Sequence, residues 1–454
     1  MTKLFGTDGI RGEVGKYPLT KDAVFSVGRA LGLWLKQRYP QETSLKILIG
    51  KDTRQSGEGL EIALLQGAKK EGLEAVRVGI CPTPTVAYLT HALDAHLGIA
   101  ISASHNPGSD NGIKFFNADG YKLFPAAERE IAEVFRGLSS KKVSFDLNLG
   151  DSKEQSDCIP IYIDFAKSSL NGSGLSGLKI VLDCAFGSFS KIAPEVFRQL
   201  GAEVLAINDQ PDGTNINVGC GSLSPEGMTK MILEQKADLG IAFDGDGDRV
   251  IVVDERGRVL DGDHMLAIFA RDLLKQNRLA QNTVVCTQMS NIGLEIFLKK
   301  LGVRIIRTDV GDKYVLEKML QEKVNLGGEQ SGHIILLEHT TTGDGLIAAL
   351  QLIKLMLKRK QKLSEFVQDL EKFPQVLVNV KVREKRPFDQ IPGLTEGIER
   401  SHLELGGRGR ILVRYSGTEN LARVMVEGED VSLVNRLAAS LAKIFEDTEG
   451  ERSR

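Results

Sequence analysis

Short apolar segments of strand character alternate with segments of helical periodicity through most of this chain, and this alternation constrains its fold more than any other feature. The first cycle predicts strands at 45–50, 73–78 and 97–101, with helices at 57–71 and 84–93 between them. Alternation of this kind is typical of βαβ units, whose strands form a buried parallel or mixed sheet. The sequence therefore predicts an α/β architecture.

Two more cycles of the same plan follow, in residues 178–243 and 283–337. A chain of 454 residues is too long for one hydrophobic core, so several domains are expected. Beyond Pro374 strands follow one another without helices between them, and a helix over 431–446 closes the chain, a pattern typical of an antiparallel α+β domain. The polar, aperiodic stretch 138–157 is the predicted first linker.

These patterns predict an α/β protein of three similar mixed-sheet domains followed by an α+β antiparallel C-terminal domain. The predicted domain ranges are 1–150, 157–254, 255–372 and 373–454.

Composition excludes several classes of protein. The formal net charge is -2 and the sequence pI is near 6.4, without the basic face or tail of a nucleic-acid binder. Five cysteines lie far apart with no CxxC pair, so we expect buried free thiols rather than disulfides or a zinc site. The first residues lack the pattern of a secretion signal, and no run of eighteen apolar residues occurs. We expect a cytoplasmic protein with no nucleic-acid or membrane partner.

Three aspartates at alternate positions directly follow the predicted strand at 239–243. Asp244, Asp246 and Asp248 are separated by glycines, which let the backbone fold so that the carboxylates converge. Carboxylate oxygens are the ligands of hard divalent cations such as Mg²⁺. An acidic surface turn explains a single Asp-Gly pair but not three aspartates at this spacing, so the sequence predicts a magnesium site.

Two other classes of site share part of this pattern. A calcium EF-hand would place its last ligand at Glu255, but Arg249 stands where that loop requires glycine, and a strand is predicted at 250–253. A haloacid-dehalogenase-type phosphatase would use Asp244 as nucleophile and Asp246 as acid. That interpretation leaves the other motifs of the chain unexplained, so the magnesium site is favoured over both.

Ser104 ends an apolar strand-like run and begins a loop that Pro107 stiffens, so its hydroxyl is expected to be exposed. A loop hydroxyl alone more often caps a turn, and we expect Ser102 either to point into the surroundings of the strand or to support the loop. A phosphorylated Ser104 beside a divalent cation could give up its phosphoryl group, with Lys114 and Arg11 neutralising negative charge. In company with the aspartates, this serine is the predicted phosphate carrier.

A glycine-punctuated polar run lies at 327–333, between apolar segments. Glu329 and Ser331 are alternate residues that can hydrogen-bond the hydroxyls of a sugar, while His333 can move a proton. A structural hydrogen bond is an equally good interpretation of the histidine alone. The run indicates a sugar-binding site mainly when it is taken together with the other motifs.

A turn rich in hydroxyl groups joins two predicted strands of the last domain. Ser416, Gly417 and Thr418 can form a concave nest of N–H and hydroxyl groups, and Arg414 and Arg423 flank it. Two guanidinium groups give charge-assisted hydrogen bonds to a phosphate. We favour a phosphate-binding turn over an ordinary hairpin with solvated arginines.

Taken in order, five motifs make the chain resemble the α-D-phosphohexomutase family over essentially its whole length. They are the run Phe5-Gly-Thr-Asp-Gly-Ile-Arg-Gly12, the Ser104 loop, the Asp244 loop, the 327–333 run and the Arg414 turn. The resemblance implies four domains around a central cleft, each contributing one loop. In chain order these loops would carry the phosphoserine, the metal, the sugar-binding residues and the phosphate-binding residues.

The resemblance also implies roles for single residues. Ser104 would be the phosphoserine, and its phosphate would bind Mg²⁺ together with Asp244, Asp246 and Asp248. The catalytic positions of the family correspond to Ser104, Lys114, His333 and Arg11, and the substrate-binding positions to Arg249, Glu329, Ser331, Arg414, Ser416, Gly417, Thr418 and Arg423.

The run Gly-Glu-Gln-Ser-Gly-His at 328–333 favours an amino-sugar substrate within this family. The resemblance then implies interconversion of glucosamine 6-phosphate and glucosamine 1-phosphate through a 1,6-bisphosphate, with glucosamine or glucose 1,6-bisphosphate as activator. Its product would feed synthesis of UDP-N-acetylglucosamine for the cell wall. A phosphomannomutase or phosphoglucomutase is the nearest alternative, and a phosphosugar-binding regulatory protein without activity is a rival of another class. Whether the chain forms a homodimer is left open.

Overall fold

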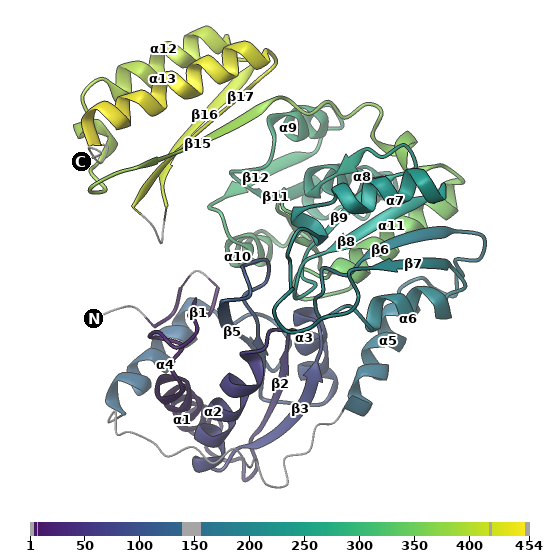
Figure 1. Ribbon diagram of the computed structural model, residues 1–454, viewed down its shortest axis with the longest axis vertical. Helices are drawn as coiled ribbons and strands as arrows, with labels where there is room; N and C mark the ends of the chain where they lie inside the picture. Colours follow the sequence, from purple (N-terminus) through teal and green to yellow (C-terminus); the bar gives the residue numbers. More distant parts are fainter. Residues whose placement is uncertain (1–3, 7, 139–155, 417–419, 450–454) are drawn as a thin grey trace. The chain divides into compact units, whose positions relative to one another are not determined.

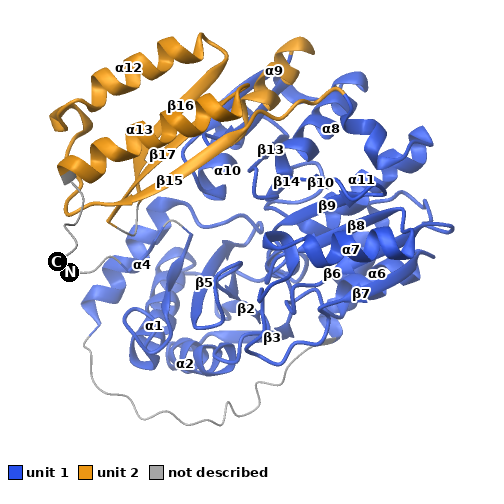
Figure 2. Ribbon diagram, turned by 45° about the horizontal axis from the view of Figure 1, so that its top comes forward, with its two compact units in different colours: residues 1–289, 303–368 blue, residues 290–302, 369–454 orange. Residues whose placement is uncertain are grey.

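The computed structural model describes residues 4–6, 8–138, 156–416 and 420–449 (Figure 1). Within these ranges the strands form three mixed sheets and one antiparallel sheet. The chain divides into two compact units, coloured in Figure 2, of which one comprises 1–289 with 303–368 and the other 290–302 with 369–454. The four predicted domain ranges stay a prediction, and the predicted linker falls almost wholly outside the described residues.

The first mixed sheet belongs to the larger unit and has the strand order β1-β5-β4-β2-β3. Strands β2, β3 and β4 are parallel, while β5 is antiparallel to both β4 and β1. Its elements are β1 (Ile10–Glu13), α1 (Lys21–Arg38), β2 (Lys46–Lys51), α2 (Gly57–Lys70), β3 (Glu74–Ile80), α3 (Thr83–Ala92), β4 (Leu97–Ile101), β5 (Asp110–Asn117) and α4 (Pro125–Gly137).

Burial on both faces explains the continuous apolar strands of this sheet. Ile47 and Ile49 of β2 belong to a core cluster that also contains residues of α1, α2 and α4. Leu48, on the opposite face of the same strand, is fully buried as well, where α3 contacts β2. Because neither face meets solvent, the sequence shows an apolar run rather than alternation.

The second mixed sheet has the order β10-β9-β8-β6-β7, and the third has the order β12-β11-β13-β14. The elements of the second region are α5 (Ile159–Ser168), β6 (Lys179–Asp183), α6 (Ile192–Gln199), β7 (Glu203–Ile207), α7 (Glu226–Gln235), β8 (Leu239–Phe243), β9 (Val250–Asp254) and β10 (Val259–Leu260). Those of the third are α8 (Gly262–Lys275), β11 (Thr283–Thr287), α9 (Ile292–Lys300), β12 (Arg304–Thr308), α10 (Asp312–Glu322), β13 (Leu326–Gly328), β14 (Ile334–Leu336) and α11 (Gly345–Arg359).

The smaller unit carries the antiparallel sheet, with β17 (Leu421–Gly428) between β15 (Gln375–Lys381) and β16 (Gly409–Tyr415). Helices α12 (Leu394–Leu405) and α13 (Val431–Glu449) contact this sheet. The structure thus confirms the predicted multi-domain α/β fold with an antiparallel C-terminal sheet.

Two simpler expectations can be compared with the described residues. All five cysteines are free and buried, as predicted. Within the described ranges, no helix has both the length and the apolar character needed to span a bilayer.

Close approach of α1 and α2 depends on two glycines. A Cβ on Gly28 would lie 2.0 Å from the carbonyl oxygen of Leu64, and a Cβ on Gly67 would lie 2.0 Å from that of Phe25. Both clashes are with backbone, which cannot move aside as a side-chain end can. These glycines therefore set the distance between the two helices.

We expect Gly67→Ala to lower the free energy of unfolding by at least about 2 kcal/mol, because the helices must separate to admit the methyl group. Gly59→Ala on the same helix is the matched control. The nearest atom to its added Cβ is Lys21 Cε at 3.8 Å. The control should gain up to about 1 kcal/mol from helix propensity. Urea unfolding followed by circular dichroism measures both, and equal midpoints for Gly67→Ala and wild type would contradict the packing argument.

Candidate active site

The Ser104 loop is held by a network from the neighbouring strand end. Ser104 has a φ of 55°, a left-handed conformation that costs a non-glycine residue about 1–2 kcal/mol. The Ser102 hydroxyl accepts the Ser104 N–H at 2.9 Å and donates to Asp52 at 2.5 Å. Arg54 pairs with Asp52 at 2.9 Å and donates to the Ser104 carbonyl at 3.0 Å. Of the two alternatives for Ser102, these contacts favour support of the loop, whereas Asp52 and Arg54 were not anticipated.

The expectation that the Ser104 hydroxyl is exposed is wrong. The residue is 1% exposed, and its Oγ donates to Asp244 Oδ2 at 2.5 Å. The loop folds inward because the two segments approach closely at Gly245, where a Cβ would lie 2.8 Å from the Ser104 carbonyl oxygen. His105 Nδ1 lies 3.3 Å from the same hydroxyl, and burial, with nearby Arg249, lowers the pKa of this histidine to about 4.

Asp244, Asp246 and Asp248 follow β8 and converge as the spacing predicts. All three are buried, and each offers a carboxylate oxygen within 4.8 Å of the others. Burial, reinforced by repulsion from Asp248 and Asp246, raises the pKa of Asp244 well above its usual value. Burial also opposes ionisation of Asp248, but Lys114 and His333 outweigh it and hold the pKa of Asp248 well below its usual value.

Lys114, on β5, supplies the cation nearest to these carboxylates. Its Nζ lies 2.7 Å from Asp246 Oδ2 and 2.8 Å from Asp248 Oδ2, with the side chain 1% exposed. Burial lowers the pKa of Lys114, but the two carboxylates raise it well above its usual value. This ammonium is therefore a charged, dehydrated group inside the cluster.

Pairing of β1 with β5 brings Arg11 to the same region. Arg11 is opposite Gly112, two residues from Lys114 on the same face of β5. Its guanidinium pairs with Asp8 at 2.7 Å, and Asp8 also pairs with Lys122 at 2.8 Å. Asp8 and Lys122 were not singled out from the sequence, although Asp8 stands within the first of the five motifs.

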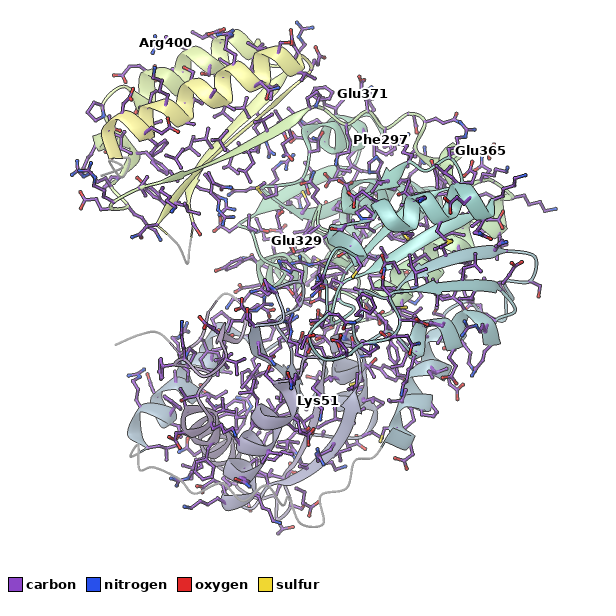
Figure 3. The ribbon with its side chains drawn as sticks, in the orientation of Figure 1. Lys51, Phe297, Glu329, Glu365, Glu371 and Arg400 are labelled. Carbon is purple, nitrogen blue, oxygen red and sulfur yellow. The ribbon has the colours of Figure 1, made fainter. Side chains whose placement is uncertain are left out.

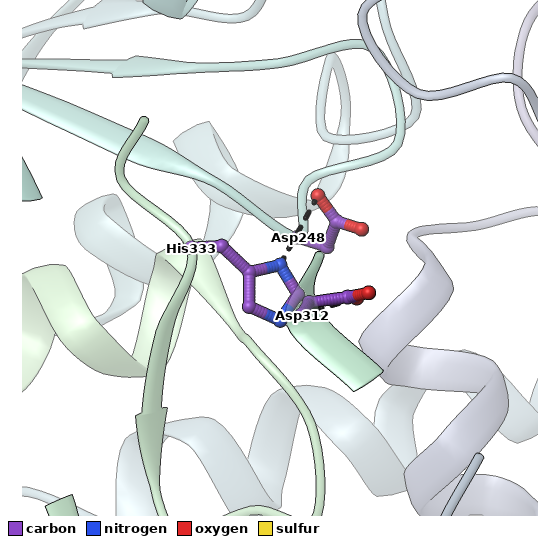
Figure 4. A group of neighbouring side chains, drawn as sticks. All are labelled: Asp248, Asp312 and His333. Carbon is purple, nitrogen blue, oxygen red and sulfur yellow. Dashed lines mark ion pairs between the residues drawn. The ribbon is translucent and has the colours of Figure 1, made fainter. Parts of the chain in front are cut away.

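His333 lies between two carboxylates, as Figure 4 shows. Its Nδ1 is 3.7 Å from Asp248 Oδ1 and its Nε2 is 3.5 Å from Asp312 Oδ2. Burial lowers the pKa of His333, while Asp312 and Asp248 together raise it above its usual value. Asp312 also pairs with Lys122, and sequence reasoning missed it.

The other predicted residues of the 327–333 run have unlike surroundings. Glu329, labelled in Figure 3, is buried, and its Oε1 accepts the Gly311 N–H at 3.1 Å. Ser331 is exposed. Arg249 donates its backbone N–H to Asp244 Oδ1 at 3.1 Å, and its Nε is 3.9 Å from Asp248 Oδ1. Of the two predicted sugar-binding residues, Glu329 is thus buried and Ser331 is exposed.

The predicted phosphate-binding turn lies in the smaller unit. Pairing of β16 with β17 sets Arg414 opposite Arg423, and Arg423 reaches the Ser416 hydroxyl at 3.5 Å. Lys385, which the sequence reasoning missed, donates to the Ser416 carbonyl at 2.6 Å. The predicted residues Gly417 and Thr418 lie outside the described residues.

Within the part of the chain that the structure describes, two groups of side chains could hold a metal ion. One is the aspartate triplet, and the other is Asp248, Asp312 and His333. In the second group the Gly343 N–H points to His333 Nε2 at 3.1 Å, and Lys122 already neutralises Asp312. The triplet is the better cation site because buried oxygens of Asp246 and Asp248 have no hydrogen-bond partner.

Comparison with known proteins identifies the family. Sequence profiles of the phosphoglucomutase/phosphomannomutase family match along the chain, with alpha/beta/alpha domain I at 2–142, domain II at 160–257, domain III at 261–373 and the C-terminal domain at 377–444. The chain belongs to this family.

Full-length relatives agree with the profiles. The phosphoglucosamine mutase of Geotalea uraniireducens is 48% identical over 452 residues, 99% of each chain. That of Solidesulfovibrio magneticus is 48% identical over 444 residues, 97% of this chain and 98% of its own. The protein is thus a phosphosugar mutase, an isomerase.

Solved structures share the fold at lower identity. A Burkholderia thailandensis protein of the phosphoglucomutase/phosphomannomutase family superposes with a TM-score of 0.78 at 22% identity, covering 98% of this chain and 97% of its own. The Aspergillus fumigatus N-acetylphosphoglucosamine mutase, solved in complex with GlcNAc-6P and magnesium, gives 0.64 at 18% identity, covering 98% and 95%.

The N-terminus of α11 contacts the loop that carries Asp244, Asp246 and Asp248. Gly345 donates its N–H to the Gly247 carbonyl at 3.0 Å, next to Asp246 and Asp248. Asp344 caps the helix by accepting the Ile347 N–H at 3.0 Å, and the Tyr162 hydroxyl donates to it at 2.8 Å. Burial raises the pKa of Asp344 to about 6.

Because the pKa of Asp344 is higher in the fold than in the unfolded chain, its protonated form favours folding, and this contribution is lost as pH rises through about 6. We expect the wild type to lose roughly 2 kcal/mol relative to Asp344→Asn between pH 4 and pH 7. Urea unfolding at several pH values measures the difference. Asp164→Asn, on the exposed face of α5, is the control and should parallel the wild type. If the unfolding free energy of Asp344→Asn changed with pH as that of the wild type does, the raised pKa would not belong to Asp344.

Proposed function

We propose that the chain interconverts glucosamine 6-phosphate and glucosamine 1-phosphate. The observation that carries this proposal is the contact of the Ser104 hydroxyl with Asp244, in a cluster that also holds Asp246, Asp248 and Lys114. Substrate choice is supported by relatives named phosphoglucosamine mutase along the full length of the chain. The aligned length and identity favour glucosamine over mannose or glucose.

In this proposal Ser104 carries a phosphoryl group at the start of the cycle. The 1-hydroxyl oxygen of glucosamine 6-phosphate attacks the phosphorus, the bond to Ser104 Oγ breaks, and glucosamine 1,6-bisphosphate forms. The proton of the attacking hydroxyl passes to a nearby base, for which His333 is the candidate, and the serine oxygen receives a proton. After the bisphosphate turns round, Ser104 takes the 6-phosphoryl group and glucosamine 1-phosphate leaves.

Lys114 and Arg11 are the proposed sources of positive charge for the transferring group. Lys114 suits this role because it is buried and held against Asp246 and Asp248. It therefore needs no reorganisation when negative charge develops on the transferring phosphoryl group. Arg11 retains an exposed fraction of 28% and is the more accessible of the two. Electrostatic neutralisation of this kind is the main contribution of proteins to phosphoryl transfer.

Mg²⁺ is the proposed cofactor, held by Asp244, Asp246, Asp248 and the phosphate on Ser104. The buried oxygens of Asp246 and Asp248 without hydrogen-bond partners fit a hard cation. When bound, the ion would neutralise negative charge on the phosphoryl group. Glucosamine or glucose 1,6-bisphosphate is the proposed activator, since it can return a phosphoryl group to an empty Ser104.

The remaining predicted residues complete the proposed substrate site. Arg414, Ser416, Gly417, Thr418 and Arg423 would hold the phosphate that is not reacting, while Arg249, Glu329 and Ser331 would contact the sugar. Lys385 adds a cation beside the Ser416 carbonyl, which supports anion binding at this turn. We further propose the four domain ranges given above, a cytoplasmic location and a product that feeds UDP-N-acetylglucosamine synthesis.

Turnover of three substrates tests the proposed specificity. With Mg²⁺ and a hexose 1,6-bisphosphate present, we expect kcat/KM for glucosamine phosphate to exceed that for mannose or glucose phosphate by at least about tenfold, which corresponds to 1.4 kcal/mol of discrimination. Coupled assays of each product measure the ratio. Faster turnover of mannose or glucose phosphate would reassign the substrate.

Replacing Ser104 tests the proposed phosphate carrier. Ser104→Ala should reduce mutase activity to background and remove the added mass of one phosphoryl group that intact-mass spectrometry finds on the wild type after incubation with the bisphosphate. Ser102→Ala is the comparison. It loosens the loop but leaves Ser104 in place, so phosphorylation should persist with lower turnover. Full activity of Ser104→Ala would refute the mechanism, and a wild type that never carries phosphate would favour a binding protein without catalysis.

A further inference from the structure

A pocket outside the catalytic cluster lies between α8 and α11 of the larger unit. It has a volume of about 150 Å³ and is lined by both helices, by the segment after β14 and by Asn171, which follows α5. None of the residues assigned above to the metal, the phosphoryl group or the sugar lines it. The mutase reaction therefore gives no account of this pocket.

The walls of the pocket are partly apolar. Phe269 and Leu273 of α8, Leu336 of β14 and Leu355 of α11 contribute to the lining. An apolar cavity of about 150 Å³ is large enough to take up a benzene-sized molecule. The pocket therefore has room for an apolar body of about one aromatic ring.

The pocket lining carries an excess of positive charge. Arg278 pairs with Glu338, and Asp272 pairs with Arg359. Lys354 and Lys358, one helical turn apart on α11, remain, and among the described residues no carboxylate lies within ion-pair distance of either. Lys354 instead donates to the Ser169 carbonyl at 2.8 Å. Two cations are thus left without a counter-ion.

The electrostatic state of Lys354 agrees with this imbalance. Burial, together with repulsion from Arg278 and Lys358, lowers the pKa of Lys354 below its usual value. Burial and Lys354 likewise lower the pKa of His339, another lining residue. An anion placed among these groups would relieve the repulsion.

We propose that this pocket binds a small organic anion, whose carboxylate or phosphate pairs with Lys354 and Lys358 and whose ring-sized apolar body packs against Phe269, Leu273 and Leu355. The apolar body distinguishes this ligand from a free inorganic ion. The proposal is independent of the substrate assigned to the catalytic cluster.

Calorimetric titrations with benzoate, phenyl phosphate and the neutral analogue benzyl alcohol test the proposal at constant ionic strength. Both anions should bind the wild type, and benzyl alcohol should bind at least about tenfold more weakly, which is 1.4 kcal/mol. A preference for one anion identifies the carboxylate or the phosphate ester as the preferred head group. Equal affinities for the anions and the alcohol, or no saturable binding of either anion, would overturn the proposal.

Matched double variants locate the binding. Lys354→Gln with Lys358→Gln should weaken both anions at least about tenfold, while Lys275→Gln with Lys360→Gln changes the charge equally outside the lining and should bind like the wild type. If the first double variant does not fold, Lys358→Gln alone, on an exposed side chain, replaces it. Equal affinity in both double variants would refute the site, as would displacement of benzoate by glucose 1,6-bisphosphate.

Discussion

The ion pairs of Lys114 with Asp246 and Asp248 are the interaction on which the rest of the catalytic cluster depends. Three aspartates within five residues could not all be buried and ionised without compensation, because each ion loses its hydration and repels its neighbours. A lysine that is 1% exposed, with its Nζ 2.7–2.8 Å from two of them, supplies much of that compensation. The buried aspartates therefore depend on Lys114 of β5, and the burial of this lysine depends in turn on their carboxylates.

This requirement explains several contacts that otherwise look unrelated. Pairing of β1 with β5 adds Arg11 and Asp8 to the cluster, and Lys122 extends it to Asp312 and then to His333. The result is a connected network of alternating charges across segments distant in sequence. Such a network fixes the positions of its members because each buried charge is compensated by its neighbours in the network.

Much of the fold could be predicted from the sequence because burial on both faces leaves an obvious pattern. β4 is an uninterrupted apolar segment, and the structure begins and ends it at the predicted residues, 97 and 101. Helix α1 was missed although ten of its residues are buried, since no βαβ cycle demanded it. The third predicted cycle, 283–337, ends in the two short antiparallel strands β13 and β14, which a tight turn of the polar residues between them joins.

The candidate site was predictable where local spacing brings residues together and not where tertiary contacts do. Asp244, Asp246 and Asp248 converge through the glycines between them, which the sequence shows directly. Asp312, by contrast, reaches His333 across 21 positions, and only the folded chain reveals it. The exposure of Ser104 was misjudged for the same reason: the loop that covers it comes from a distant strand end.

The assignment of residues 290–302 to the smaller unit has a consequence for how that unit could arise or be removed. The chain passes between the units at 289–290, at 302–303 and at 368–369, so the smaller unit is not a terminal appendage joined by one linker. Asn291 is hydrogen-bonded to both the N–H and the carbonyl of Phe373, and the Ile292 N–H is bonded to Glu427. Cutting the chain near residue 369 would strip α9 of these partners. Gene fusion or deletion at that point could not exchange the C-terminal sheet as an independent domain. Residues 290–302, which belong to the same unit, are encoded upstream of it.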